Sequence, residues 1–255
     1  MVKIKIIQLN SDNIDQYGLH CITNPKNQGY IKKSEWLRNK FKECFFFKVA
    51  YDESVKKVVG FIEYIAGEKC YRGISAKSYI VIHCLGNWTK GFNDKGIASS
   101  LLKDSIDYAK KKGFNGVCTV CSDASFLTGK EIYLKNGFKI FEETDNFQLV
   151  GIEFKKSVKP KFNDWKNNLS KVKGLNLFYA YQCNALVKSV NDIKNMSKEK
   201  GWKINFIELK TAKEVQNAAS PFGVFYIVKD GKMLCDRYCS LGKFKGIAKK
   251  IGLKV

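Results

Sequence analysis

The stretch from Tyr79 to Phe138 restricts the fold of this 255-residue chain more than any other part of it. It begins with a run of mostly apolar, β-branched residues, Tyr79 to Leu85, which is typical of a strand buried on both faces. After a polar loop, apolar side chains recur at helical spacing from Ile97 to Ala109, and lysines followed by Gly113 end the pattern. A buried strand that leads directly into a helix predicts an α/β fold.

The loop before this helix has the composition of an anion site. The first turn of a helix leaves backbone N–H groups unpaired at the positive end of the helix dipole, so it attracts phosphate. Gly96, Ala98 and Ser99 are small enough to let a diphosphate approach these groups, and Lys95 adds positive charge. Taken alone, this pattern is also compatible with an ordinary turn.

A second pattern follows in the chain and carries a family resemblance. Residues 116–120 predict a strand, and residues 130–139 predict a short helix that ends at a glycine. The loop 93–98, Asn-Asp-Lys-Gly-Ile-Ala, resembles the Arg/Gln-x-x-Gly-x-Gly/Ala loop of GNAT N-acetyltransferases. The segment 132–138, Ile-Tyr-Leu-Lys-Asn-Gly-Phe, resembles their Leu-Tyr-x-x-x-Gly-Phe segment. Asn93 departs from the family's Arg or Gln, which leaves backbone donors to hold the phosphate at that point.

The resemblance implies a fold and a cosubstrate. The fold is the GNAT acyl-CoA N-acyltransferase fold, whose mixed β-sheet splays open where acetyl-CoA enters. The predicted order β-α-α-β-β-β-α-β-α-β fits it, with a helix over residues 34–44 that Ser34 caps. The implied partners are acetyl-CoA and an amine-bearing acceptor, and no metal is expected. The residues implied to hold coenzyme A are Cys84, Leu85, Asn93, Asp94, Lys95, Gly96, Ile97, Ala98 and Ser99.

Three residues are candidates for the acid–base chemistry. In the family an amine attacks acetyl-CoA directly, a strand N–H near Cys84 polarises the carbonyl, and Tyr133 matches the tyrosine that protonates the leaving thiolate. Glu63 lies in an apolar strand, where a buried carboxylate would have a raised pKa. His83 is the rival base. Packing roles for Tyr133 and His83, an exposed position for Glu63, and a chain of waters in place of a fixed base remain open.

The composition changes after residue 155. Residues 1–155 predict the GNAT domain, residues 156–172 a lysine-rich linker, and residues 173–255 a second domain of order β-α-β-α-β-β-α. That order resembles a thioredoxin-like fold, with Cys183 where such folds place an active cysteine and Pro221 where they place a cis-proline. The motif from Cys183 to Leu186 lacks a second cysteine, so dithiol exchange within it is excluded. A reactive thiol and a structural cysteine are both left open.

Four further segments, in both parts of the chain, carry a closer resemblance. They are residues 60–68, 82–85, 182–183 and 220–223. With them the chain resembles the YoaP-like group of two-domain acetyltransferases. The group does not indicate which amine is the acceptor.

The net charge of +21 suggests a nucleic-acid partner at first sight. Arginine occurs only at Arg38, Arg72 and Arg237, and the lysines are spread along the whole chain, so we expect no nucleic-acid binding. An anionic cofactor accounts for part of the charge. The sequence has no apolar run of about 18 residues and no signal peptide, and its nine cysteines suggest free thiols, so we expect a cytoplasmic protein without membrane contact.

Three classes of function therefore remain open. The first is an N-acetyltransferase, the second a non-catalytic acyl-CoA sensor, and the third a thiol-dependent redox or carrier protein centred on Cys183. The second domain has three open roles, which are substrate delivery, contact within a homodimer, and shielding of the acceptor cleft.

Overall fold

The structure is a computed structural model that describes residues 3–87, 89–92, 95–124 and 127–255. Its internal contacts divide the chain into two compact units. The first unit comprises Met1–Pro25, Ser34–Cys70 and Ile74–Phe162, and the second comprises Lys26–Lys33, Tyr71–Gly73 and Asn163–Val255. Two short segments of the N-terminal half therefore belong by their contacts to the unit that the C-terminal residues build. The domain limits at residues 155 and 173 remain a prediction.

A seven-stranded mixed sheet forms the frame of the first unit. Its strands, in spatial order, are β1 (Ile4–Gln8), β2 (Phe46–Asp52), β3 (Lys57–Ala66), β5 (Tyr79–Gly86), β6 (Gly116–Cys121), β8 (Gln148–Glu153) and β7 (Lys139–Glu143). Strands β5 and β6 run parallel, whereas every other neighbouring pair is antiparallel. The predicted mixed α/β fold is therefore confirmed.

The parallel pair at the centre of the sheet separates part-way along. Strands β5 and β6 pair only from Tyr79 opposite Gly116 to Ile82 opposite Thr119. On the other side of β5, Cys84 is opposite Glu63 and Ile82 is opposite Tyr64, so His83 is an extra residue that forms a β-bulge. A bulge bends its strand, and the segment from His83 to Gly86 leaves β6. The predicted splay of the sheet is therefore present at β5 and β6.

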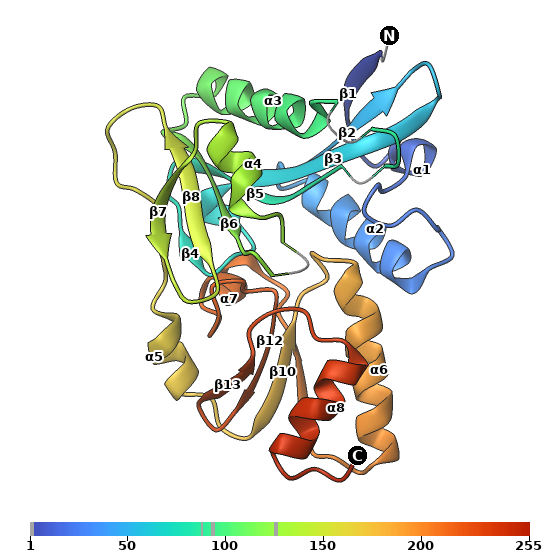
Figure 1. Ribbon diagram of the computed structural model, residues 1–255, viewed down its shortest axis with the longest axis vertical. Coiled ribbons are helices and arrows are strands. Elements are labelled where there is room, and N and C mark those ends of the chain that lie inside the picture. Colours follow the sequence, from blue (N-terminus) through green and yellow to red (C-terminus); the bar gives the residue numbers. More distant parts are fainter. Residues whose placement is uncertain (1–2, 88, 93–94, 125–126) are drawn as a thin grey trace. The chain divides into compact units, whose positions relative to one another are not determined.

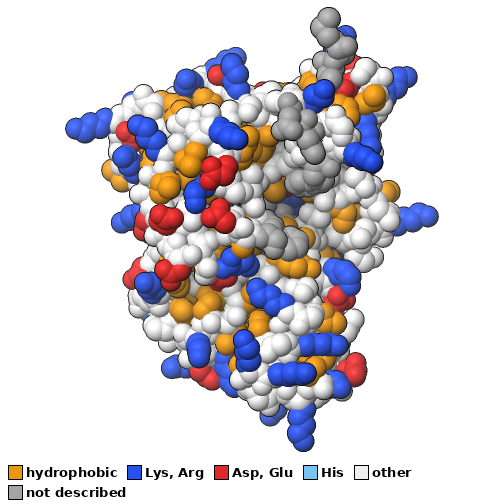
Figure 2. Space-filling model, viewed as in Figure 1, with side chains coloured by type: hydrophobic (Ala, Val, Ile, Leu, Met, Phe, Trp, Pro, Cys, Tyr) orange, Lys and Arg blue, Asp and Glu red, His pale blue; other side chains and the backbone are white. Residues whose placement is uncertain are grey.

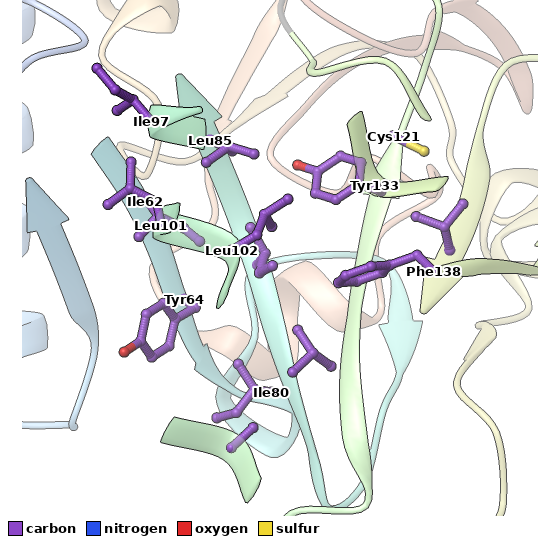
Figure 3. Packing of buried hydrophobic residues seen from close by; sticks show 14 of the residues in the cluster. Ile62, Tyr64, Ile80, Leu85, Ile97, Leu101, Leu102, Cys121, Tyr133 and Phe138 are labelled. Carbon is purple, nitrogen blue, oxygen red and sulfur yellow. The ribbon is translucent and has the colours of Figure 1, made fainter. Parts of the chain in front are cut away.

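Helix α3 (Ile97–Lys111) covers one face of this sheet, where it contacts β3, β5 and β6 (Figure 1). Its apolar stripe closes a core to which α4 (Lys130–Lys135) also contributes. Burial of one such aliphatic or aromatic side chain stabilises the fold by about 1.5–3 kcal/mol. Figure 3 shows part of this core, whose buried members are Ala50, Val59, Ile62, Tyr64, Ile80, Ile82, Leu85, Ile97, Leu101, Leu102, Ala109, Val117, Cys121, Tyr133, Phe138 and Val150.

The helices before β2 differ partly from the prediction. Helix α1 spans Ile14–Tyr17, and α2 spans Gln28–Phe41, so α2 begins six residues before the predicted cap Ser34. The side chain of Asn27 accepts a hydrogen bond from the N–H of Gly29 at 2.8 Å, so Asn27 caps the helix and Ser34 lies inside it. Gly29 in the first turn weakens the helical pattern there, which explains the wrong boundary.

The second unit has a four-stranded sheet in the order β11 (Asn205–Glu208), β10 (Leu175–Tyr179), β12 (Phe225–Lys229) and β13 (Lys232–Cys235). Only β10 and β11 are parallel. The helices that follow β10 are α6 (Ala185–Glu199), α7 (Ala212–Gln216) and α8 (Leu241–Lys250). This is the predicted order of elements. The α7 start carries the full capping box of Thr211 and Glu214, and Asp230 and Gly231 both have the positive φ that a type I′ hairpin requires.

The segment predicted as a linker contains regular structure. Strand β9 (Lys161–Phe162) pairs with β4 (Ile74–Ser75), and α5 (Trp165–Ser170) begins at Asp164, whose carboxylate accepts the N–H of Asn167 at 3.2 Å. A short 3₁₀ turn, η1 (Gly67–Lys69), precedes β4. Within the described ranges, no helix combines the length and apolar character that crossing a bilayer requires.

Candidate active site

The start of α3 presents bare backbone donors. Gly96 is the N-cap with φ of +71°, a left-handed conformation that favours glycine, and no side chain of the described residues caps the helix. The N–H of Ser100 bonds to the oxygen of Gly96 at 2.9 Å, so the N–H groups before it lie outside the helical ladder. No acidic residue lies in the first turn. Lys95 is exposed, whereas Asn93 and Asp94 lie outside the described residues.

Gly60 on β3 lets the helix start come close to the sheet. A Cβ atom at this position would lie 2.8 Å from Cγ2 of Ile97 and 3.1 Å from the backbone oxygen of Gly86. Both distances are too short for ordinary carbon contacts, so a larger residue would push α3 outward. The first residue of α3 therefore lies directly beside the end of β5.

The two sequence motifs touch each other. The side-chain amide of Asn136, at the end of α4, donates to Oγ of Ser99 at 3.2 Å and to the oxygen of Ile132 at 2.8 Å. Ser99 belongs to the first turn of α3, and Tyr133 lies between Ile132 and Asn136. These bonds fix the helix that carries Tyr133 relative to the loop that starts α3.

Tyr133 is buried at the splay, with 2% of its surface exposed. The hydroxyls of Thr119 and Thr128 lie beside its own hydroxyl. Thr119 in turn donates to the oxygen of Ile82 at 2.9 Å, and Thr128 donates to the oxygen of Leu85 at 2.7 Å. Figure 3 shows the Tyr133 hydroxyl directed toward the strand that carries Leu85. The two threonines beside the phenol are thus bonded to β5 on either side of the bulge.

Burial fixes the protonation state of this phenol. Loss of contact with water raises the pKa of Tyr133 well above its usual value, and the neighbouring thiols of Cys84 and Cys121 raise it further. The two threonine hydroxyls lower it by a smaller amount. Tyr133 therefore holds its proton throughout the neutral range and is suited to donate a proton rather than to accept one.

The end of β5 offers an open backbone edge. Strand β6 supplies no partner beyond Ile82, and the carbonyl of Leu85 points to this side, because it accepts the Thr128 hydroxyl. The N–H and C=O of one strand residue point to the same edge, so the Leu85 N–H also faces the splay. Half-buried Cys84 precedes it. An extended molecule that enters the splay can add to β5 as a strand would.

The two candidate bases lie on the opposite face of the sheet. Ile62 and Tyr64 belong to the core under α3, so Glu63 between them points to the other side. Ile82 belongs to the same core, whereas its neighbour His83 stacks its ring on Phe45 with centroids 5.4 Å apart. Glu63 and His83 are each 2% exposed, so Glu63 does not occupy an exposed face. The sheet therefore lies between the phenol of Tyr133 and both of these residues.

Cys183 belongs to the second unit, whereas Tyr133, Glu63 and His83 belong to the first. It is half-buried just before α6, and its carbonyl accepts the N–H of Leu186 at 3.3 Å. No cis peptide bond occurs among the described residues, so the Ser220–Pro221 bond is trans and departs from the position expected of a cis-proline.

Three features of the site were absent from the sequence prediction. Thr119 is the hydroxyl residue of a strand whose other members are Gly, Val and Cys, which is a weak signal for a polar role. Thr128 lies in a loop that shows no recognisable pattern, and the bulge at His83 leaves no mark in an apolar run. All three depend on contacts between segments far apart in the chain.

Comparisons with known proteins give one relative along nearly the whole chain. No family model matches. The chain is 26% identical over 247 residues to the uncharacterized N-acetyltransferase YoaP of Bacillus subtilis (strain 168), and the match covers 94% of this chain and 96% of that protein.

Solved structures are similar over part of the chain. The PaiA N-acetyltransferase of Thermoplasma acidophilum in complex with coenzyme A is 19% identical with a TM-score of 0.44, and the match covers 60% of this chain and 99% of that chain. A GNAT-family acetyltransferase of Staphylococcus aureus Mu50 is 17% identical with a TM-score of 0.43, and the match covers 60% and 100% of the two chains.

Proposed function

We propose that this chain is a GNAT-type N-acetyltransferase that transfers the acetyl group of acetyl-CoA to a primary amine. One observation carries the proposal: the bare start of α3, the open edge of β5 and the protonated Tyr133 meet at the splay, with Asn136 bonded to Ser99 between them. The identity of 26% with a protein named as an N-acetyltransferase, over 94% of this chain, supports it.

In this proposal the cosubstrate follows the open edge of β5. The diphosphate of acetyl-CoA binds the N–H groups of Ile97, Ala98 and Ser99, beside Gly96 and the charge of Lys95. Asn93 and Asp94, which the sequence motif also implies for coenzyme A binding, lie outside the described residues. The pantetheine arm then adds to β5 at Cys84 and Leu85, and the Leu85 N–H donates to the thioester oxygen.

The reaction proceeds by direct attack. The uncharged amine adds to the thioester carbon, and the Leu85 N–H stabilises the negative charge that develops on oxygen. The C–S bond then breaks, the amide forms, and Tyr133 transfers its proton to the sulfur of coenzyme A. Glu63, His83 or a water takes the proton that the amine loses, and the phenol regains a proton after the product leaves.

The raised pKa of Tyr133 is compatible with this role. Burial also raises the pKa of the neighbouring Cys121 thiol, to about 12. A coenzyme A thiolate that forms in the same surroundings is similarly deprived of water, so it becomes a stronger base than it is in solution. Burial thus shifts the basicity of the phenolate and of the thiolate in the same direction.

The proposal is tested by release of coenzyme A from acetyl-CoA across a panel of primary amines. We expect Tyr133→Phe to lower kcat by about 10²–10⁴-fold and to leave the affinity for acetyl-CoA nearly unchanged in calorimetry. If no amine raises the release of coenzyme A above the blank while acetyl-CoA still binds, the catalytic reading fails and the non-catalytic acyl-CoA sensor is left. Absence of saturable binding would remove both readings and leave the thiol-dependent alternative at Cys183.

We propose further that the second unit is a thioredoxin-like domain. Its strand order and its single parallel pair support this, as does the position of Cys183 directly before α6. The trans bond before Pro221 is the departure from that class.

A further inference from the structure

A short segment of the N-terminal half, Tyr71–Gly73, belongs by its contacts to the second unit. It lies between η1 and β4, and all three residues are buried, with 0% of Tyr71 and 2% of Arg72 exposed. A buried arginine is rare, because hydrogen-bond acceptors of the protein must replace the water around its charge. The partners of Arg72 and of its two neighbours therefore indicate the role of the segment.

The backbone of the segment lies between two stretches of the second unit. The N–H of Gly73 donates to the oxygen of Pro221 at 3.1 Å, and the oxygen of Gly73 accepts the N–H of Asn163 at 3.0 Å. The hydroxyl of Tyr71 donates to the oxygen of Lys210 at 3.1 Å. The segment is thus bonded to three separate stretches of the second unit, as an extended peptide ligand would be.

Arg72 is the central contact of this segment. Its Nη1 donates to Oε1 of Gln182 at 3.1 Å and to the oxygen of Tyr71 at 2.8 Å. Its Cζ lies 5.1 Å from the centroid of the Phe222 ring, which places the cation against an aromatic face. Gln182 and Phe222 are each 2% exposed. Because water is excluded from these contacts, each of them is stronger than it would be at the surface.

Gln182 is held by a second cation as well. Nζ of Lys33 donates to the backbone oxygen of Gln182, and Lys33 is buried and also belongs to the second unit. Half-buried Cys183 is the next residue in the chain, directly before the start of α6. Two cations that come from distant parts of the sequence therefore fix the loop that carries Cys183.

Two glycines permit the close approach of the segment. A Cβ atom at Gly73 would lie 2.4 Å from the oxygen of Ser220 and 3.2 Å from Cα of Pro221, and one at Gly223 would lie 3.0 Å from the nitrogen of Gly73. The atoms in the way belong to the backbone, which cannot move aside as a flexible side chain can. Gly73 does not have a positive φ, so lack of space alone opposes an alanine there.

We propose that Tyr71–Gly73 is an internal ligand of the second unit, anchored by Arg72, which holds the loop of Cys183 in its half-buried state. As long as the segment is docked, Gln182 and Pro221 are bonded to it and cannot bind an extended peptide of another protein. Undocking is a local opening that leaves the sheets intact. The proposal is independent of acetyl transfer, since it involves no residue of the splay.

Thiol alkylation of the full-length chain tests the proposal. The chain is treated with iodoacetamide at neutral pH for increasing times and quenched, and the remaining thiols are labelled with heavy iodoacetamide after denaturation. Cys70, which is buried directly before the segment, and Cys183 report undocking. Exposed Cys44 gives the rate of an open thiol, and Cys118, buried in β6, reports opening of the whole fold.

Two variants undock the segment in different ways. Arg72→Ala removes the anchor, and Gly73→Ala keeps the anchor but removes the space. We expect each variant to raise the alkylation rates of Cys70 and Cys183 by about 10- to 100-fold, as for the loss of a hydrogen bond to a charged group. Arg72→Lys keeps a cationic donor and should give an intermediate rate.

A third glycine provides the matched control. A Cβ atom at Gly246, within α8 of the second unit, would meet no atom within 4 Å, so Gly246→Ala should leave all four alkylation rates unchanged. The proposal is overturned if neither Cys70 nor Cys183 reacts faster in the two segment variants. It is also overturned if Cys118 accelerates by the same factor, because the segment then opens only together with the whole fold.

Discussion

Gly96 adopts a left-handed conformation with open space around its α-carbon, so a methyl group there acts through the backbone alone. A non-glycine residue in that conformation costs about 1–2 kcal/mol. In Gly96→Ala the backbone would relieve this strain by changing its conformation, which turns the first N–H groups of α3 away from their present direction. We expect the dissociation constant of acetyl-CoA to rise roughly five- to tenfold. Isothermal calorimetry measures this directly.

Gly113 provides the matched control at the other end of the same helix. Its φ is +75°, and a Cβ there would also meet no atom within 4 Å. Gly113→Ala should therefore lose a similar amount of stability in thermal unfolding but leave the affinity for acetyl-CoA unchanged. Equal losses of affinity in the two variants would show that the start of α3 has no special part in binding.

Thr128 is a positioning residue in this account, because its hydroxyl donates to the oxygen of Leu85 and lies beside the Tyr133 hydroxyl. Thr128→Val keeps the shape of the side chain and removes the bond to Leu85 and the hydroxyl beside Tyr133, so we expect kcat to fall about tenfold or more with KM for acetyl-CoA little altered. Thr128→Ser should restore most of the rate. A loss of rate that serine does not restore would point to packing of the methyl group instead.

At the scale of elements, one ion pair holds α3 against the sheet. Lys48 on β2 lies 2.6 Å from the carboxylate of Asp104 on α3, with 13% and 27% of these side chains exposed. The ammonium group also lies 5.7 Å from the ring of Tyr64. We expect Asp104→Asn to lower the free energy of unfolding by about 1–2 kcal/mol, as measured by urea denaturation.

The same helix offers a control pair on its solvent side. Lys103 and Asp107 are 2.7 Å apart but largely exposed, so solvent screens their attraction. Asp107→Asn should leave the denaturation midpoint unchanged within error. A similar shift in both variants would mean that the helix responds to charge in general and not to its anchor on β2.

The elements differ in how far the sequence could predict them. Helix α3 was readable because its apolar period and its terminal glycines agree, and α7 because Thr211 and Glu214 form a complete capping box. The start of α2 was not readable, because Gly29 breaks the pattern directly after the capping Asn27. The bulge at His83 and the bonds of Thr128 arise only when distant segments meet. Local patterns thus predicted the motifs, whereas the geometry of the splay required the fold.

At the scale of the whole molecule, the charge of +21 is distributed rather than gathered. Figure 2 shows Lys and Arg side chains scattered over the visible face, with acidic side chains among them. Such a field attracts small anions from many directions. The main expected consequence of this positive field is faster and tighter binding of an anionic cosubstrate at low salt.

Salt titration tests this consequence. We expect the affinity for acetyl-CoA to fall several-fold between about 0.05 and 0.5 M salt, because the Debye length shortens from roughly 14 Å to about 4 Å. Acetyl-pantetheine, which lacks the diphosphate, serves as the control and should bind with little dependence on salt. An equal dependence for both molecules would remove the electrostatic account of the loop at Gly96.

A crystal structure of the chain with coenzyme A is the most direct test of the central claim, which is that the start of α3 and Tyr133 serve one ligand. The account predicts diphosphate oxygens about 2.8–3.1 Å from the N–H groups at Ala98 and Ser99, with the sulfur beside the Tyr133 hydroxyl in the gap between β5 and β6. A diphosphate bound away from α3, or a sulfur on the far side of the sheet from Tyr133, would contradict it.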